Sequence, residues 1–158
     1  MDASSLITLF GQEAGIPLAL NEAGTVSLAV ESGPVLHLEH DPQADVLHCY
    51  VVLGQTPADP MRRQAVFREM LAANAFGRDT GGSTLGLDEV TGELLLSRRL
   101  ELAHADTAWL RTVMESMVAV ARHWQQRLDG DVPAGVTDPV ADTPASSNDL
   151  LPGFGLRV

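Results

Sequence analysis

The chain has 158 residues, of which 45% are hydrophobic and only 4% aromatic, and its formal net charge is −11 at pH 7. This length and composition predict one domain with a core of aliphatic residues. The acidic balance argues against nucleic acid as a partner, because phosphate binding needs clustered cations, and also against an anionic membrane surface. All ten basic residues are Arg, which excludes a lysine-dependent P-loop or Schiff base.

The sequence indicates a soluble, cytoplasmic protein. Its single cysteine, Cys49, rules out an internal disulfide and fits a reducing compartment. No basic leader followed by an apolar run opens the chain, and no apolar run approaches the roughly 20 residues of a membrane span.

A short first helix is predicted near the start of the chain. Ser4 or Ser5 is the predicted N-cap, and Gly15 followed by Pro17 ends the helix. At about three turns, this helix is stable only if its apolar face packs on the rest of the domain.

Three strands are predicted to follow. Apolar and polar residues alternate along Thr25–Glu31 and Val35–His40, which is typical of half-buried strands. Residues Val46–Leu53 are apolar on both faces, which predicts the most central strand. The connections are short and therefore predict antiparallel neighbours.

The second helix is predicted to begin with Asp59 at the N-cap and Pro60 at the first helical position. Its apolar residues cover nearly half the circumference, which is broader than one core contact needs. The extra width predicts either a sheet on one side and a partner subunit on the other, or full burial in a monomer. The residues concerned are Val66, Phe67, Met70, Leu71 and Ala73.

A β-hairpin and a long helix complete the predicted domain. Residues Thr84–Asp88 alternate as a strand, Glu89–Gly92 is a turn signal, and a second strand begins at Leu94. Asp106 caps the predicted helix Thr107–Leu128. Its apolar stripe consists of Leu110, Met114, Met117, Ala121, Trp124 and Leu128. The element order predicts an α+β sandwich in which helices pack against a twisted antiparallel sheet.

The chain changes character after Asp129. The segment 130–158 is rich in Pro, Gly, Ala, Ser and Asp and shows no periodicity, which predicts a disordered acidic tail following a folded domain at 1–129. The terminal Leu-Pro-Gly-Phe-Gly-Leu-Arg-Val is apolar again. Such a tip either docks back on the domain, binds a partner or stays unattached.

The stretch around the hairpin resembles the central signature of the Tir-chaperone (CesT-like) family, the class I chaperones of bacterial type III secretion. The resemblance extends from about Leu6 to Leu128. The residues that carry it are Leu71, Asn74, Phe76, Thr80-Gly81-Gly82, Leu85-Gly86-Leu87-Asp88 and Thr91-Gly92.

This resemblance implies a fold of the order helix-β-β-β-helix-β-β-helix in a small cytoplasmic bacterial homodimer without catalytic activity or cofactor. It implies that the protein holds the N-terminal region of a secreted effector in an extended, secretion-competent form. A secretion regulator and the secretion-system ATPase are further partners that it allows. One alternative function is a regulatory chaperone that binds a small regulator of the secretion system, and another is a small enzyme of unknown type.

The resemblance also assigns candidate residues, each of which is equally suited to an ordinary core. The implied effector-binding residues are Leu6, Phe10, Val26, Leu28, Val30, Leu36 and Leu38. The implied dimer-interface residues are Val66, Phe67, Met70, Leu71, Leu85 and Leu87.

The residues give little support to catalysis or metal binding. His37 and His40 lie three apart on a predicted strand and so point to opposite faces. Cys49 lies among apolar neighbours and is interpreted as a small core residue. The Thr80-Gly81-Gly82 turn follows a helix and precedes a strand, which is the reverse of a phosphate-binding loop. We therefore expect no catalytic residues, no metal and no cofactor.

Overall fold

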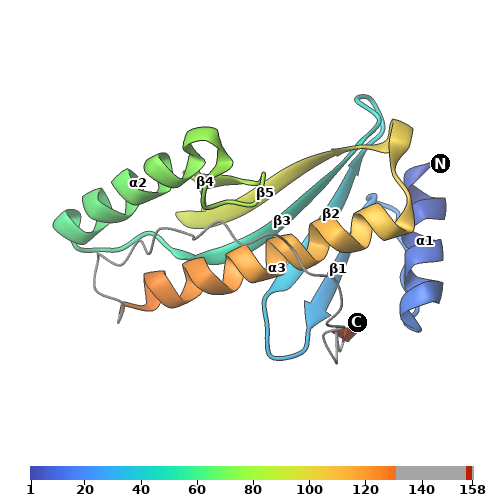
Figure 1. The fold of residues 1–158 in the computed structure, drawn as a ribbon, viewed down its shortest axis with the longest axis horizontal. Helices are drawn as coiled ribbons and strands as arrows, with labels where there is room; N and C mark the ends of the chain where they lie inside the picture. The colour runs from blue at the N-terminus through green and yellow to red at the C-terminus, as the bar shows by residue number, and fades with distance from the viewer. Residues whose placement is uncertain (131–155, 158) are drawn as a thin grey trace, which may run out of the picture.

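A computed structural model gives the structure of the protein and describes residues 1–130 and 156–157. Its sheet has six strands in the order β4-β5-β3-β2-β1-β6, and all neighbouring strands are antiparallel (Figure 1). The elements are α1 (Ala3–Ala14), β1 (Thr25–Val30), β2 (Val35–Asp41), β3 (Val46–Gln55), α2 (Pro60–Asn74), the 3-10 turn η1 (Ala75–Gly77), β4 (Thr84–Asp88), β5 (Glu93–Glu101), the 3-10 turn η2 (Leu102–His104), α3 (Thr107–Asp129) and β6 (Leu156–Arg157).

The predicted α+β order of helix, three strands, helix, two strands and helix is confirmed over α1 to α3. The predicted central position of β3 is also confirmed, because β3 pairs with β2 on one side and with β5 on the other. The prediction of a disordered tail concerns residues 131–155 and 158, which lie outside the described part of the chain. Within the tail, Leu156–Arg157 form β6, a strand that the sequence did not predict.

The first helix begins earlier than predicted, because its cap is Asp2 and not Ser4 or Ser5. The Asp2 carboxylate accepts hydrogen bonds from the Ser5 N–H at 3.0 Å and from the Ser5 hydroxyl at 2.8 Å. The backbone bond is the main cause of a lowered pKa at Asp2. A carboxylate at this position satisfies an orphan N–H and also faces the positive end of the helix dipole, so it is a better cap than a serine one turn later.

The other predicted helix ends are confirmed. Gly15 ends α1 in the left-handed conformation at φ 71°, which a residue without a Cβ adopts at no steric cost. Asp59 caps α2 through the N–H of Arg62. Asp106 caps α3 through the N–H of Trp109 at 2.7 Å. These caps explain where each helix begins.

One face of the sheet forms a single core with all three helices, and the other face stays open. The buried strand residues include Leu28, Leu36, Leu38, Cys49, Val51, Leu94, Leu96 and Leu100. The predicted stripe of α3 packs on them, with Leu110, Met114, Met117, Ala121 and Trp124 buried and Leu128 partly buried. On the opposite face, Ser27, Glu39 and His48 are exposed. The alternation read from the sequence therefore describes a half-buried sheet.

The family signature holds α2 against β4. The side chain of Asn74, the last residue of α2, donates to the Leu85 carbonyl at 3.0 Å and accepts from the Leu85 N–H at 2.9 Å. The amide side chain thus replaces a neighbouring strand at that residue of β4. In the turn between them, Arg98 donates to the Gly81 carbonyl at 2.9 Å, and Gly81 has φ 57°. The signature is therefore structural at these positions.

Two arginine contacts tie α2 to the end of α3. Arg127 on α3 forms an ion pair with Glu69 on α2 at 2.6 Å. The hydrogen bond to Glu69 is the main cause of a raised pKa at Arg127. Arg62 donates to the Leu128 carbonyl. Together these contacts hold α2 beside the C-terminal end of α3.

Candidate functional site

The exposed large apolar residues point to the surfaces that the fold leaves without a partner. In the described residues they are Met1, Leu9, Val35, Met61, Leu71, Phe76, Leu87 and Val90. Five of these, from Met61 to Val90, belong to α2, to the turns that follow α2 and β4, or to β4 itself. Exposed apolar side chains that are grouped in this way indicate an interaction surface, whereas single scattered ones do not.

The first surface is the α2–β4 groove, a shallow hollow of about 220 Å³ lined by Phe67, Met70, Leu71, Asn74, Leu85, Gly86 and Leu87. The side chain of Leu71 is 72% exposed and that of Leu87 is 40% exposed. A Cβ placed on Gly86 would meet no atom within 4 Å, so this strand is open to another chain. β4 is also the last strand of the sheet at this end.

The predicted dimer-interface residues divide between this groove and the core. Leu71 and Leu87 are exposed and Phe67 is partly buried, so all three are available to a partner. Met70 and Leu85 are buried and form the floor of the groove. Val66 is buried in the core and does not line the groove.

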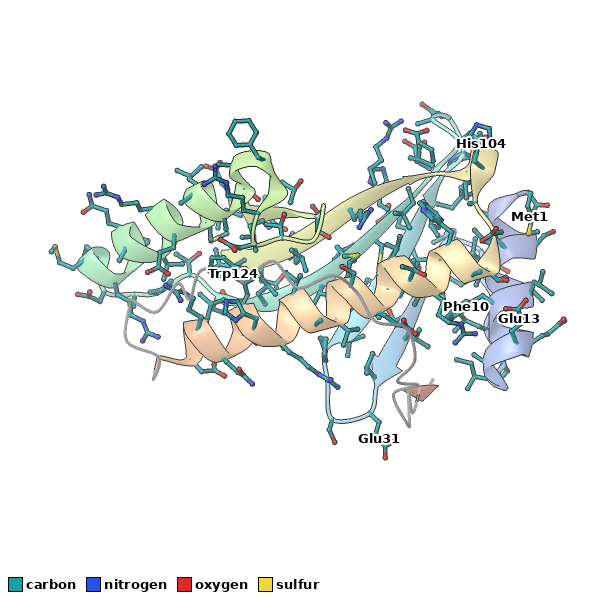
Figure 2. The ribbon with its side chains drawn as sticks, in the orientation of Figure 1. Met1, Phe10, Glu13, Glu31, His104 and Trp124 are labelled. Atoms are coloured by element: carbon teal, nitrogen blue, oxygen red, sulfur yellow. The ribbon has the colours of Figure 1, made fainter. Side chains whose placement is uncertain are left out.

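The predicted effector-binding residues lie in or against the core. Six of them are buried, namely Leu6, Phe10, Leu28, Val30, Leu36 and Leu38. Val26 is partly buried. Phe10 on α1 lies on the side of that helix toward α3 (Figure 2). The Arg111 guanidinium of α3 lies 5.2 Å from its ring centre. In the single chain these side chains are covered, so a partner would contact the exposed residues beside them.

Sequence reasoning missed the exposed neighbours on the same elements. Leu9 on α1 is 39% exposed and Val35 at the start of β2 is 41% exposed. Leu9 lines a shallow depression on the outer side of α1 together with Met1, Ser4, Ser5, Thr8 and Gln12. Leu9 lies beside the buried face of α1, and because it is three residues after Leu6 its spacing alone does not distinguish it from that face.

The second surface is the β1 edge, which we define as the backbone of Thr25–Val30 on the side away from β2. Only Ala29 and Val30 pair on this side with described residues, namely those of β6. Along Thr25–Leu28 the described chain supplies no strand on that side. A strand edge of this kind presents N–H and C=O groups that can pair with an extended peptide.

Charge distinguishes this end of the molecule from the other. Residues 1–55, from α1 through β3, contain seven acidic residues and no Arg or Lys; the acids are Asp2, Glu13, Glu22, Glu31, Glu39, Asp41 and Asp45. Two arginines of α3 reach this half, Arg111 at Phe10 and Arg122 at the Glu31 carbonyl. The part of the chain that contains β1 is therefore acidic by its own sequence, which favours a basic partner.

The described residues offer little chemistry for catalysis. Burial raises the pKa of the Cys49 thiol to about 12, so it is protonated and unreactive at neutral pH. Over residues 1–130 and 156–157, no three His, Cys, Asp or Glu side chains lie together as metal ligands. His37 instead stacks on Tyr50 at 4.9 Å between ring centres. None of the helices in the described part has the length and apolar character needed to cross a membrane.

An open strand edge, an exposed apolar groove and an α+β core together define a small protein that binds other polypeptides. Residues 5–125 match the Tir chaperone protein (CesT) family. The chain belongs to this family, which confirms the resemblance seen in the sequence, and it is a chaperone and not an enzyme. No curated protein sequence matches the chain.

Three solved structures of similar fold are complexes of two proteins. The HopA1–SchA chaperone–effector complex contains a chain that is 20% identical, with a TM-score of 0.64 over 77% of this chain and 91% of that chain. The ExsC–ExsE complex gives 21% identity and a TM-score of 0.65 over 80% of this chain and 96% of that chain. The heterodimeric ExoU–SpcU complex from the type III secretion system of Pseudomonas aeruginosa gives 19% identity and a TM-score of 0.60 over 78% and 95%.

Proposed function

We propose that the protein is a type III secretion chaperone of the bacterial cytoplasm, which binds the N-terminal region of a secreted effector and holds it extended for secretion. Membership of the Tir chaperone family supports the class of function. The observation that carries the mode of binding is the β1 edge, where Thr25–Leu28 have no strand neighbour on one side among the described residues. The similar HopA1–SchA structure is a chaperone–effector complex.

The β1 edge suits an extended client. Pairing of main-chain groups gives affinity without demanding a particular sequence, while alternate side chains of the added strand provide specificity. The exposed Leu9 on the outer side of α1 offers apolar contact to residues beyond the added strand. Seven acidic residues and no Arg or Lys in residues 1–55 favour a client segment with a net positive charge.

We propose further that the α2–β4 groove is the homodimer interface. It contains exposed apolar side chains at Leu71 and Leu87 over a buried floor of Met70 and Leu85. A stable dimer buries on the order of 1,200–2,000 Å² in total, so the groove would be the centre of a larger contact. Phe76, which is 94% exposed and held at φ 60°, is the neighbouring aromatic side chain best placed by sequence to extend it.

Affinity capture from the native bacterial cytoplasm, followed by mass spectrometry and then by calorimetry with the identified segment, tests this function. We expect the full chain to bind the N-terminal segment of a secreted protein with a negative heat-capacity change, because apolar surface is buried. Leu9→Asp is expected to weaken binding by roughly tenfold or more, and Val90→Asp, also at an exposed apolar site but on the β4–β5 turn, is the matched control. Binding of the C-terminal domain of the captured protein, or equal affinity in the two variants, would refute the proposal.

The same experiment separates the alternative functions. A small regulator of the secretion system among the captured proteins would favour the regulatory chaperone. Capture of the secretion-system ATPase together with the client would show that the complex is delivered to the export apparatus. A small-molecule turnover by the purified chain would be the result required for an enzyme.

A further inference from the structure

The end of the chain lies against the strand edge that we assign to the client. In the described structure β6 pairs antiparallel with β1, with Arg157 opposite Ala29 and Leu156 opposite Val30. β6 is thus the outermost strand of the sheet, next to β1, which is the last strand formed by residues 1–130. The pairing covers the Ala29–Val30 end of the β1 edge. On this side of β1, Thr25–Leu28 have no strand neighbour among the described residues.

The sequence of this end has the pattern of a peptide that binds by strand addition. Phe154, Leu156 and Val158 are apolar and alternate with Gly155 and Arg157. This period of two is what an added strand needs in order to place alternate residues on one face. Val30, which pairs with Leu156, is only 7% exposed and belongs to the core. The pairing therefore adds a strand to the sheet at a core position of β1.

The charge of the tip also matches its place. Arg157 is the only basic residue after Arg127, and all charged residues between the two are acidic. The tip therefore carries a single basic residue, and its backbone pairs with a strand of residues 1–55, which contain seven acids and no Arg or Lys. This is the charge that we expect of a client segment.

The intervening chain is long enough for this contact. Residues 131–155 join the end of α3 to β6, and an extended chain covers about 3.3 Å per residue, so they can span on the order of 80 Å. The whole of α3, from Thr107 to Asp129, is only about 35 Å long at 1.5 Å per residue. Attachment through the same chain gives the tip a millimolar effective concentration at the edge, which lets a short strand bind there.

We propose that β6 is a built-in pseudo-client, which occupies the β1 edge of the chain without a client and is displaced when an effector segment adds its strand. The proposal rests on the proposed function for its competitor, but the docking of β6 is independent of it. Because β6 covers only two residues of the edge, a client pairs first along Thr25–Leu28 and then replaces β6 at Ala29 and Val30. The tip thereby protects the edge from pairing with other strands. It also prevents binding of ligands whose affinity for the edge is too low to displace β6.

Occupancy sets the size of the effect. A competitor that holds the edge for nine-tenths of the time leaves one-tenth of the molecules competent, which weakens the apparent affinity of a client about tenfold. A strand pair of two residues is marginal by itself, so we expect a loss of about three- to tenfold and not complete inhibition.

The first experiment tests docking in the full chain by disulfide trapping. Ala29→Cys with Arg157→Cys places two thiols on directly opposite residues, where Cα atoms lie about 4.5–5.5 Å apart and a disulfide can form. Ser27→Cys with Arg157→Cys is the matched control, because Ser27 lies two residues away on the same strand and is exposed. The native Cys49 thiol does not compete, since it is buried with a pKa of about 12. We expect rapid intramolecular oxidation in the first pair only; equal rates in the two pairs would refute the docking.

The second experiment tests competition with a defined probe, a fluorescent synthetic peptide with the sequence of residues 151–158. Leu156→Pro removes a backbone donor from β6 and should raise the affinity of the full chain for the probe about three- to tenfold over wild type. Val140→Pro, outside the tip, is the control and should leave it unchanged. The oxidised Ala29→Cys/Arg157→Cys protein should lose probe binding and regain it on reduction. Identical affinities in wild type, Leu156→Pro and the oxidised protein would overturn the proposal.

A third measurement separates this inference from the proposed function. The captured effector segment should bind the reduced cross-link variant and bind the oxidised form at least about tenfold more weakly. Equal binding to both forms would overturn the competition, because the client would then use another surface. If no effector segment binds any form while trapping and probe displacement behave as expected, β6 docks on the β1 edge as proposed, but the proposed function fails and with it the displacement by an effector.

Discussion

Replacing Leu71 tests the homodimer most directly, because this side chain is 72% exposed in the single chain and lines the α2–β4 groove. Burying a Leu side chain fully is worth about 1.5–3 kcal/mol, so covering the exposed part of Leu71 is worth roughly 1–2 kcal/mol. In a two-fold dimer the residue counts twice, and Leu71→Ala should cost roughly 2–4 kcal/mol of association free energy. That corresponds to a dissociation constant raised roughly 30-fold to several hundred-fold.

Sedimentation equilibrium at micromolar concentration gives the result. The wild type should have twice the chain mass of 16.8 kDa, and Leu71→Ala should shift toward the monomer. Met61→Ala is the matched control, since Met61 is 76% exposed on the same helix but does not line the groove. Both substitutions are at exposed sites, so the free energy of unfolding of the monomer should change by less than about 0.5 kcal/mol. A monomeric wild type, or the same shift in both variants, would show that the groove is not the interface.

Three further results are expected from the structure. Asn74→Ala removes both hydrogen bonds to the Leu85 backbone and should lower the free energy of unfolding by about 2–3 kcal/mol in urea titration; a change below 0.5 kcal/mol would mean that solvent replaces them. The pKa of Cys49 is raised to about 12 from 9.0, so the buried thiol should resist thiol reagents at pH 8 until the protein unfolds. The free energy of unfolding should fall as the pH rises from about 9 to 12, because the thiol ionises in the unfolded chain before it ionises in the folded one. A chain ending at Gly130 should keep its melting temperature within a few degrees, since β6 pairs with only two residues of β1; a large drop would show that the removed segment supports the core.

Periodicity and end signals gave the order of elements because each reports a local physical requirement. The carboxylates of Asp59 and Asp106 cap their helices as predicted, and alternation in β1 and β2 separates buried from exposed residues. At α1, however, the sequence indicated Ser4 or Ser5 as the cap, and only the structure shows that Asp2 accepts the hydrogen bond from the N–H of Ser5.

Exposure is a tertiary property, and here the sequence was less informative. The family resemblance assigned Leu28 and Phe10 as binding residues, but both are buried, because the most apolar positions of a small domain form its core. The β1 edge follows from the sheet order, which places β1 last among the strands of residues 1–130 and β3 in the middle. The exposure of Leu9 follows from the side of α1 that packs on the core. β6 could not be predicted, because a strand of two residues has no periodicity of its own and depends on the edge that it meets.

The sheet order also fixes how the two proposed surfaces work together. β4 and β1 are four strand spacings apart, on the order of 20 Å at about 4.8 Å per spacing, so dimerisation at β4 leaves both β1 edges free at the far ends. The two edges of a dimer then lie on the order of 50 Å apart once the two sheets and the contact between them are added. A client that adds a strand to both needs at least about 15 extended residues between its two anchors.

Graded fragments of the captured effector segment test this geometry. A fragment with one anchor strand should bind two per dimer, and a fragment long enough to reach both edges should bind one per dimer and displace both β6 strands. The second step of binding is then intramolecular, so affinity should rise by a factor of 10² or more when the linking length is reached. A gradual rise in affinity with length, without the change in stoichiometry, would show that each client stays on a single protomer.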